Sequence, residues 1–271
     1  MEYEFVRYEK EGGIGLLTLN RPEVMNAHNY QMKVEFQTVA ERVKNDDDVR
    51  VLIITGAGRG FSAGEDVKQI QIGGEYERLR LDQMRGLLGQ LSEEDWTTQL
   101  SPRYFAGYPK PTVAAVNGPA VGAGLSIALS CDVRVGSEAA AFGYSYTRRG
   151  LMGSPRAIVS LLQLTGLSRT LEMTLSGELV SAQEAERIGL LSRIVPADQL
   201  IDEAKAVATK LMQGAPLAQR AIKETIYRML YDINGIQYFG DRVGAALIET
   251  EDHVEGSRAF VQRRSADWKS R

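Results

Sequence analysis

Apolar residues along this chain gather in short runs that are rich in β-branched side chains. Runs of this kind at 14–19, 51–55 and 112–116 have the length and composition of buried strands. Weaker alternation and shorter apolar segments occur elsewhere, and they indicate further strands. The strands that we predict cover residues 3–9, 14–19, 51–55, 112–116, 131–135 and 190–195.

Other apolar residues recur every three or four positions, which is the spacing of one face of an α-helix. Met32, Phe36, Val39 and Val43 follow this spacing in the first third of the chain. The helices that we predict cover residues 30–43, 154–164, 168–174, 182–188 and 200–211, and helical patterns continue to Trp268. Strands and helices therefore alternate first, and helices dominate the last third. This order predicts an α/β core with a helical tail.

The pattern loosens between residues 69 and 108. Two amphipathic helices are predicted there, near 81–91 and 96–105. Two interpretations stay open for this region, a cover over a pocket and a solvated pair of surface helices.

Two glycine-rich turns each follow an apolar strand and precede a segment compatible with a helix. The first reads Phe-Ser-Ala-Gly-Glu-Asp-Val at 61–67, and the second reads Asn-Gly-Pro-Ala-Val-Gly-Ala-Gly at 117–124. Such turns expose backbone N–H groups that can hold a developing negative oxygen. Either turn alone more often has a structural role. Together they suit an oxyanion hole.

Composition narrows the class of protein. The chain has 271 residues, 44% of them hydrophobic and 25% charged, which is ordinary for a globular protein with one large domain or a domain with a subdomain. The net charge is −3 and no basic stripe is present, so nucleic acid is not the expected partner. No apolar run has the length of a membrane span. The acidic start lacks the features of a signal peptide. We therefore expect a cytoplasmic protein.

The residues that commonly bind metals are scarce. The two histidines, His28 and His253, have no Cys/His spacing beside them, so no metal site is predicted. Cys131 is the only cysteine, which excludes an intramolecular disulfide and fits a reducing compartment. Its place in an apolar run favours a small buried side chain.

Motifs along nearly the whole chain resemble the crotonase superfamily, also called the enoyl-CoA hydratase/isomerase family. The matching stretches are residues 14–22 with Asn26 and Ala27, 61–66, 110–118, 122–124, 181–185, 189–190 and 255–260. The resemblance implies an α/β fold, a spiral of ββα units with a C-terminal helical region. It implies an acyl-CoA-binding core at 1–196 and a helical trimerisation region at 197–271. A homotrimer or homohexamer is expected.

The resemblance also implies roles for particular residues. The backbone N–H groups of Glu65 and Ala123 would hold the thioester oxygen of an acyl-CoA substrate while an enolate forms. Ala27, Ala63 and Val67 would lie near the adenine and pantetheine. Coenzyme A enters as part of the substrate, and no prosthetic group is expected.

The chain departs from the family at the acid–base positions. Family hydratases carry two glutamates where this chain has Ser126 and Tyr146. Serine cannot act as an ionised base near neutral pH, while a phenol can donate a proton. The Glu65 carboxylate is the best remaining acid–base candidate, and a solvent-facing or ion-paired side chain is the alternative.

These departures leave the reaction open. The chain is expected to be a lyase or isomerase of the enoyl-CoA hydratase/isomerase type that hydrates crotonyl-CoA weakly. Isomerisation, decarboxylation or C–C cleavage then become candidate reactions. The alternative is a catalytically silent acyl-CoA-binding subunit.

Overall fold

The computed structural model describes residues 3–66, 108–149, 153–231, 250–262, 264 and 266–269. The two helices predicted near 81–91 and 96–105 lie outside the described residues, as does Val67. Among the described helices, none is both long enough and apolar enough to cross a membrane.

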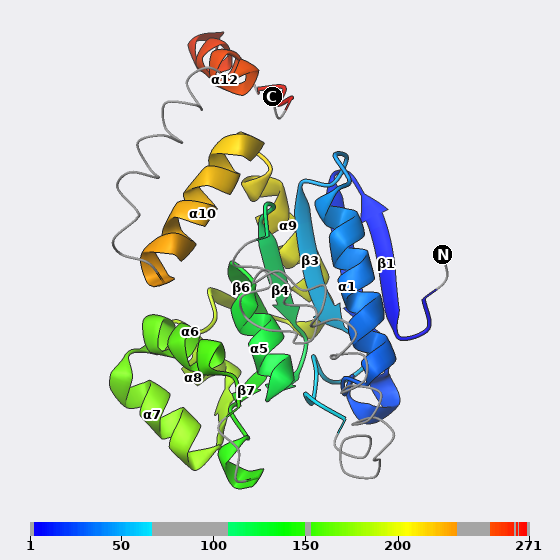
Figure 1. The fold of residues 1–271 in the computed structure, drawn as a ribbon, viewed down its shortest axis with the longest axis vertical. Helices are drawn as coiled ribbons and strands as arrows, with labels where there is room; N and C mark the ends of the chain where they lie inside the picture. Colours follow the sequence, from blue (N-terminus) through cyan, green and yellow to red (C-terminus); the bar gives the residue numbers. More distant parts are fainter. Residues whose placement is uncertain are drawn as a thin grey trace, which may run out of the picture.

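A largely parallel sheet forms the centre of the fold (Figure 1). Its strand order is β1-β2-β3-β4-β6-β9; β1 runs antiparallel to β2, and the other neighbours are parallel. The strands are β1 (Val6–Glu11), β2 (Ile14–Leu19), β3 (Val51–Gly56), β4 (Thr112–Val116), β6 (Val133–Ser137) and β9 (Arg193–Val195). Each predicted strand is therefore present, with the boundaries of β1, β6 and β9 shifted by a few residues.

A second, smaller sheet was not predicted. It contains β5 (Pro119–Val121), β7 (Ala141–Gly143) and β8 (Leu179–Ser181), in the order β5-β7-β8. A parallel bridge between Ser62 and Ala120 continues this pairing toward the first glycine-rich turn. Strands of three residues are too short to show a period of two, which is why the sequence pattern missed them.

Helices occupy the predicted segments and extend by a few residues at most. They are α1 (Tyr30–Lys44), α5 (Ala123–Ser130), α6 (Pro155–Thr165), α7 (Leu167–Ser176), α8 (Ala182–Arg187), α9 (Leu200–Leu211), α10 (Pro216–Tyr231) and α12 (Glu251–Gln262), with short 3-10 turns at η1 (Pro22–Val24), η2 (Thr147–Arg149) and η3 (Ala197–Gln199). The order β4, β5, α5 repeats as β6, β7, α6. This repeat is the ββα unit that the family resemblance implies.

Both faces of the main sheet are covered, which explains why β3 reads as a continuous apolar run. Leu52 and Ile54 pack into a cluster that includes Phe36 of α1. Val51 and Ile53 point the other way, into a smaller cluster with residues of α9. The sheet thus lies between α1 and α9, and its strand ends carry the glycine-rich turns to one side of the molecule.

The last third of the chain is a helical region, as predicted, and α10 and α12 extend beyond the sheet (Figure 1). A buried polar cluster attaches α10 to the core. Lys223 Nζ lies 2.7 Å from Asp132 Oδ2, and the Tyr227 hydroxyl donates to Asp132 Oδ1 at 3.0 Å. Burial raises the pKa of Tyr227, so its hydroxyl stays protonated and keeps this contact.

Candidate active site

Gly64 brings the two glycine-rich turns together. Its φ is +92°, and a Cβ placed on it would lie 2.7 Å from the Val121 carbonyl oxygen and 3.0 Å from the Ala123 nitrogen. Only glycine adopts this conformation at such a short approach without strain. The backbone that leads into Glu65 therefore lies directly against the first residue of α5.

Backbone hydrogen bonds fix this contact. Val121 N–H donates to the Ser62 carbonyl at 2.9 Å, and Ser62 N–H donates to the Pro119 carbonyl at 3.0 Å. Gly124 packs so closely on Ser62 that a side chain there would clash with its backbone. The two turns therefore form one rigid unit although about 60 residues separate them in the sequence.

Two backbone N–H groups at this contact have no acceptor among the described residues, those of Glu65 and Ala123. Ala123 is the first residue of α5, where the N–H lacks a partner inside the helix. Glu65 pairs with His28 in a parallel bridge whose bonds use the Gly64 carbonyl and the Asp66 N–H. Because backbone groups alternate along an extended chain, the Glu65 N–H faces the opposite edge.

The side chain of Asn26 bonds the backbone that leads into the 61–66 segment. Its amide nitrogen donates to the carbonyls of Ala57 and Gly60, both at 2.9 Å, and of Phe61 at 3.2 Å. Its oxygen accepts from the Arg21 N–H at 2.8 Å. Asn26 is fully buried, and both polar atoms of its side chain have hydrogen-bond partners.

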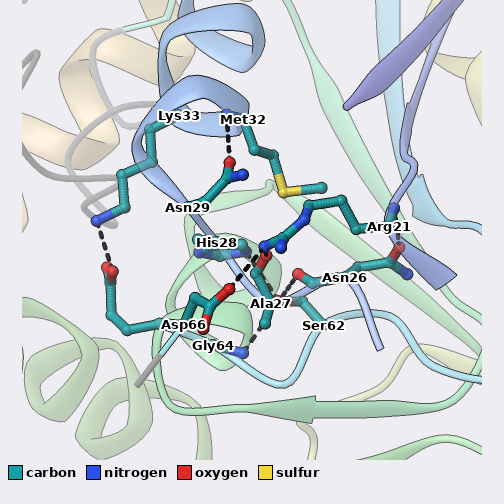
Figure 2. A network of polar contacts seen from close by, with 11 residues as sticks. Arg21, Asn26, Ala27, His28, Asn29, Met32, Lys33, Ser62, Gly64 and Asp66 are labelled. Atoms are coloured by element: carbon teal, nitrogen blue, oxygen red, sulfur yellow. Dashed lines mark hydrogen bonds and ion pairs between the residues drawn. The ribbon is translucent and has the colours of Figure 1, made fainter. Parts of the chain in front are cut away.

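Two ion pairs flank the Glu65 backbone (Figure 2). Arg21 Nη1 lies 3.0 Å from Asp66 Oδ2 and also donates to the Ala27 carbonyl at 2.6 Å. Lys33 of α1 lies 2.5 Å from the Glu65 carboxylate. The sequence left two possibilities for the Glu65 side chain, an acid–base role and a solvent-facing or ion-paired side chain. In this structure the carboxylate is ion-paired beside the turn.

His28 contributes a neutral imidazole to this network. It is 1% exposed, and its Nε2 lies 2.8 Å from the Ser62 hydroxyl (Figure 2). Burial, followed by the charges of Lys33 and Arg21, lowers the pKa of His28 to about 3. The ring is therefore uncharged at neutral pH and supports the Ser62 backbone.

Ser126 and Tyr146, the two positions that the family resemblance singles out, have different surroundings. Ser126 is 2% exposed, and its hydroxyl donates to the Gly122 carbonyl one helical turn earlier, at 3.3 Å. The Tyr146 ring approaches the same glycine from another segment. A Cβ on Gly122 would lie 3.8 Å from Tyr146 Cζ and 3.9 Å from its hydroxyl oxygen.

Two contacts position the Tyr146 ring. Gly153 (φ +74°) leaves no room for a Cβ against one side of the ring. The Tyr144 ring packs on it with centroids 4.9 Å apart and planes tilted by 59°. Burial raises the pKa of Tyr144 to about 12, so this neighbour stays protonated. The phenol of Tyr146 is thereby held beside Gly122.

The remaining predicted residues lie along the same segments. Ala27 is buried, and Ala63 donates its N–H to the Met25 carbonyl at 2.8 Å. Val67 lies outside the described residues. Sequence reasoning did not single out Lys33, Tyr144 or Gly153, because each is distinguished only by a three-dimensional contact, with Glu65 for Lys33 and with Tyr146 for the other two. No group of three or more potential metal ligands occurs in the described parts of the chain.

Comparisons with known proteins identify the family and the fold. The model of a family described as enoyl-CoA hydratase/isomerase matches residues 9–271. A probable enoyl-CoA hydratase of Mycobacterium bovis is 32% identical, with 100% of both chains covered. A short-chain-enoyl-CoA hydratase of Clostridium acetobutylicum is also 32% identical, over 98% of each chain. The solved structure of enoyl-CoA hydratase subunit I from Geobacillus kaustophilus superposes with a TM-score of 0.84 at 31% identity, over 100% of each chain.

Proposed function

The chain belongs to the enoyl-CoA hydratase/isomerase family of acyl-CoA enzymes, and we propose that it stabilises a thioester enolate between the N–H groups of Glu65 and Ala123. The observation that carries this proposal is the contact of Gly64 with Ala123. This contact brings together the two turns whose N–H groups have no acceptor among the described residues.

The physical basis is the charge that develops on the thioester oxygen when a proton or a carbon group leaves the α carbon. Two N–H dipoles that are already oriented stabilise this charge without reorganisation, and the start of α5 adds its positive end. In comparable holes, loss of one donor lowers turnover roughly 100- to 1,000-fold. Glu65 and Ala123 thus act through their backbones, whatever their side chains do.

The side chains favour a reaction other than fast hydration. Adding water requires a base for the water and an acid for the α carbon. The Ser126 hydroxyl donates to its own helix, and a phenol such as Tyr146 ordinarily titrates near 10. We infer weak hydration of crotonyl-CoA, with isomerisation, decarboxylation or C–C cleavage as candidate reactions and Tyr146 as proton donor.

The Glu65 carboxylate is the candidate base in this proposal. It lies 2.5 Å from Lys33, so a catalytic role requires the carboxylate to leave this ion pair when substrate binds. Lys33 comes from the first turn of α1, a few residues after Ala27 in the sequence. Ala27, Ala63 and Val67 would line the coenzyme A site on this side.

The proposed assembly is a homotrimer or homohexamer in which residues 197–271 form the trimerisation region and residues 1–196 the acyl-CoA-binding core. α10 supports this proposal because it exposes an apolar face to solvent. The exposed residues of this face are Ile222, Ile226, Met229 and Leu230. A monomer rarely leaves such a row uncovered.

Ligand binding and turnover test the proposal separately. Free coenzyme A at millimolar concentration should raise the thermal midpoint, because it binds only the folded state. Bound acetoacetyl-CoA should show increased absorbance of its enolate, which a pocket without the hole would not produce. An unchanged midpoint together with an unchanged spectrum would contradict the proposal.

Variants then test the side chains on the best substrate of an acyl-CoA panel. Glu65→Gln and Tyr146→Phe should each lower turnover while preserving the backbone donors and the enolate spectrum. Fast hydration of crotonyl-CoA by wild type and by both variants would refute this assignment of the chemistry. The second candidate function is a catalytically silent acyl-CoA-binding subunit. Two observations favour it: Glu65 is ion-paired with Lys33, and the Ser126 hydroxyl donates to the Gly122 carbonyl of its own helix start. It predicts binding and no turnover across the whole panel.

A further inference from the structure

The conformation of Gly64 decides where the Glu65 N–H points, and both backbone polar groups of Gly64 are hydrogen-bonded. Its carbonyl accepts from the His28 N–H at 2.7 Å, and its own N–H donates to the Ser62 hydroxyl at 3.1 Å (Figure 2). In a planar trans peptide, the Gly64 carbonyl and the Glu65 N–H point in opposite directions. The bond from His28 therefore fixes the direction of the Glu65 N–H.

Gly64 depends on such bonds because it restricts its own backbone least. Its φ is +92°, and glycine without a side chain moves readily away from any one conformation. Only contacts from outside then hold the 64–65 peptide in one orientation. An oxyanion hole works when its donors are oriented before charge develops. Whatever holds Gly64 thus contributes to the hole without being part of it.

The Ser62 hydroxyl connects the His28 ring to Gly64. Ser62 is fully buried, and three groups lie within hydrogen-bond distance of its oxygen: the Gly64 N–H at 3.1 Å, the Asn26 carbonyl at 2.9 Å and His28 Nε2 at 2.8 Å. A carbonyl only accepts, so the single hydroxyl proton goes to Asn26. The His28 ring must then donate to the hydroxyl oxygen, which assigns the neutral ring to the tautomer with hydrogen on Nε2.

The other ring nitrogen supports the same tautomer. Nδ1 of His28 is buried and has no hydrogen-bond partner among the described residues. With hydrogen on Nε2, Nδ1 carries only a lone pair. With hydrogen on Nδ1, a buried donor would lack an acceptor there, and the single Ser62 proton could not serve both the ring and the Asn26 carbonyl. Buried donors without an acceptor are rare and costly.

We propose that His28 is a positioning residue of the oxyanion hole, with its main-chain N–H holding the Gly64 carbonyl and its ring Nε2–H holding the Ser62 hydroxyl that accepts from Gly64. One residue thereby fixes both ends of Gly64 and aims the Glu65 donor. Hydrogen bonds in such a chain also polarise one another, which strengthens that donor. The inference rests on the proposed function, and it adds a residue that acts only through Gly64 and Ser62.

The first experiment removes the ring donor. His28→Leu preserves the main-chain bond and an apolar buried side chain, so Gly64 loses one of its two constraints. On the best panel substrate, kcat should fall about tenfold, a part of the loss expected for a whole donor, while KM changes little. His28→Gln should recover most of this rate, since its amide can donate near the position of Nε2. Unchanged kcat in His28→Leu, or no recovery in His28→Gln, would overturn the inference.

The second experiment interrupts the same path at the hydroxyl. Ser62→Ala should lower kcat as well, and the double variant His28→Leu/Ser62→Ala should lose little more than Ser62→Ala alone, because both changes act through one oxygen. Losses that multiply would mean that the two residues act independently, contrary to the inference. Ser130→Ala is the matched control: it removes another buried hydroxyl, which donates to the Ile127 carbonyl at 2.6 Å, and should leave kcat unchanged.

The enolate absorbance of bound acetoacetyl-CoA separates positioning from folding. His28→Leu and Ser62→Ala should both keep their stabilisation by coenzyme A. At saturating acetoacetyl-CoA both should show a weaker enolate absorbance than wild type, because a misdirected donor stabilises less charge. Undiminished absorbance in both variants would overturn the inference and leave the hole standing. Absence of the absorbance in wild type would overturn the hole, and this inference with it.

Nitrogen NMR tests the tautomer in the unaltered protein. The chain has two histidines, so selective labelling gives the signals of two rings, and the set that disappears in His28→Gln belongs to His28. At neutral pH this ring should have hydrogen on Nε2 and a lone pair on Nδ1. Hydrogen on Nδ1 would overturn the inference, whether or not His28→Leu folds.

Discussion

The two segments that meet at Gly64 are held in place by different forces. Polar side chains from distant positions hold the 61–66 segment. The Asn26 amide donates to the Phe61 carbonyl, the His28 ring bonds the Ser62 hydroxyl, and an ion pair with Arg21 holds Asp66. Each of these partners comes from the stretch before α1, so the segment depends on a few specific groups.

Close packing holds the 122–126 segment. Gly122 N–H donates to the Gly143 carbonyl at 2.9 Å, and Gly124 lies against the Ser62 backbone. Every residue of α5 is buried. The position of this segment therefore depends on the space available to its side chains and not on charged groups.

This difference predicts how the two segments that supply the donors of the proposed hole respond to substitution and to pH. The 61–66 segment should be sensitive to loss of single polar groups and to protonation. The 122–126 segment should be sensitive to added volume and tolerant of polar losses. In both segments the proposed donors of the hole are backbone N–H groups, so the proposal for the hole does not depend on the side chains at 126 and 146.

The largest effect is expected where the two segments touch. In Gly64→Ala the new methyl group would lie 2.7 Å from the Val121 carbonyl in a backbone conformation with positive φ. The two turns must then separate, and turnover of the best panel substrate should fall roughly 100- to 1,000-fold. Gly60→Ala is the matched control, since its methyl group would meet only Met25 at 3.5 Å or more. Equal turnover in the two variants would contradict the proposed hole.

The polar side of the comparison is tested by removing the Asn26 amide. Asn26→Ala leaves three buried carbonyls without this donor and places alanine at φ 54°. We expect a loss of about 3 kcal/mol in the free energy of unfolding, measured with urea. Asn117→Ala removes a similar amide at a partly exposed site and should cost about 1 kcal/mol. An equal loss of unfolding free energy in both variants would contradict a special role for the Asn26 amide.

Acid should weaken the same polar segment. The folded pKa of His28 is about 3, below the unfolded value near 6.5, so the unfolded chain binds a proton that the folded one does not. Its contribution to stability is complete above pH 6.5 and declines as pH falls toward 3. Between pH 7 and pH 5 this costs about 2 kcal/mol. His28→Gln should remove that part of the pH dependence, measured by urea unfolding at both pH values.

An unchanged slope in His28→Gln would show that His28 is protonated alike in both states. The expected result is a smaller difference between pH 7 and pH 5 than in wild type, whatever the absolute stability of the variant.

Features that repeat along the sequence could be predicted, and contacts between distant segments could not. The run at 51–55 gave β3 because both faces of this strand are buried. The two glycine-rich turns were found because their pattern is local. β5, β7 and β8 were missed because three residues carry no period, and Lys33 was not linked to Glu65 because helical spacing only assigns it to a polar face.

The acid–base side of the site shows the same limit. Residues 126 and 146 could be named because the family resemblance implies a role for these positions, but their surroundings could not be predicted. Tyr146 depends on Gly153 and Tyr144, which meet it only after the chain has folded. The roles of Ser126 and Tyr146 therefore stay predictions that variants must test.

The smallest effect is expected at Ser126, on the packed side of the comparison. Its hydroxyl donates to Gly122, whose carbonyl also accepts the Ser126 N–H at 3.1 Å, so Ser126→Ala leaves that carbonyl bonded. Alanine also favours the helix more than serine does. Turnover should stay within about threefold of wild type, since no donor of the hole is lost. Tyr146→Phe should lower it at least tenfold, because a phenol that donates a proton beside Gly122 has no substitute at that position. The measurement is the turnover rate of Ser126→Ala and of Tyr146→Phe on the best panel substrate, each compared with wild type. An equal fall in the two would mean that the serine hydroxyl takes part in the chemistry and that packing alone does not account for the 122–126 segment.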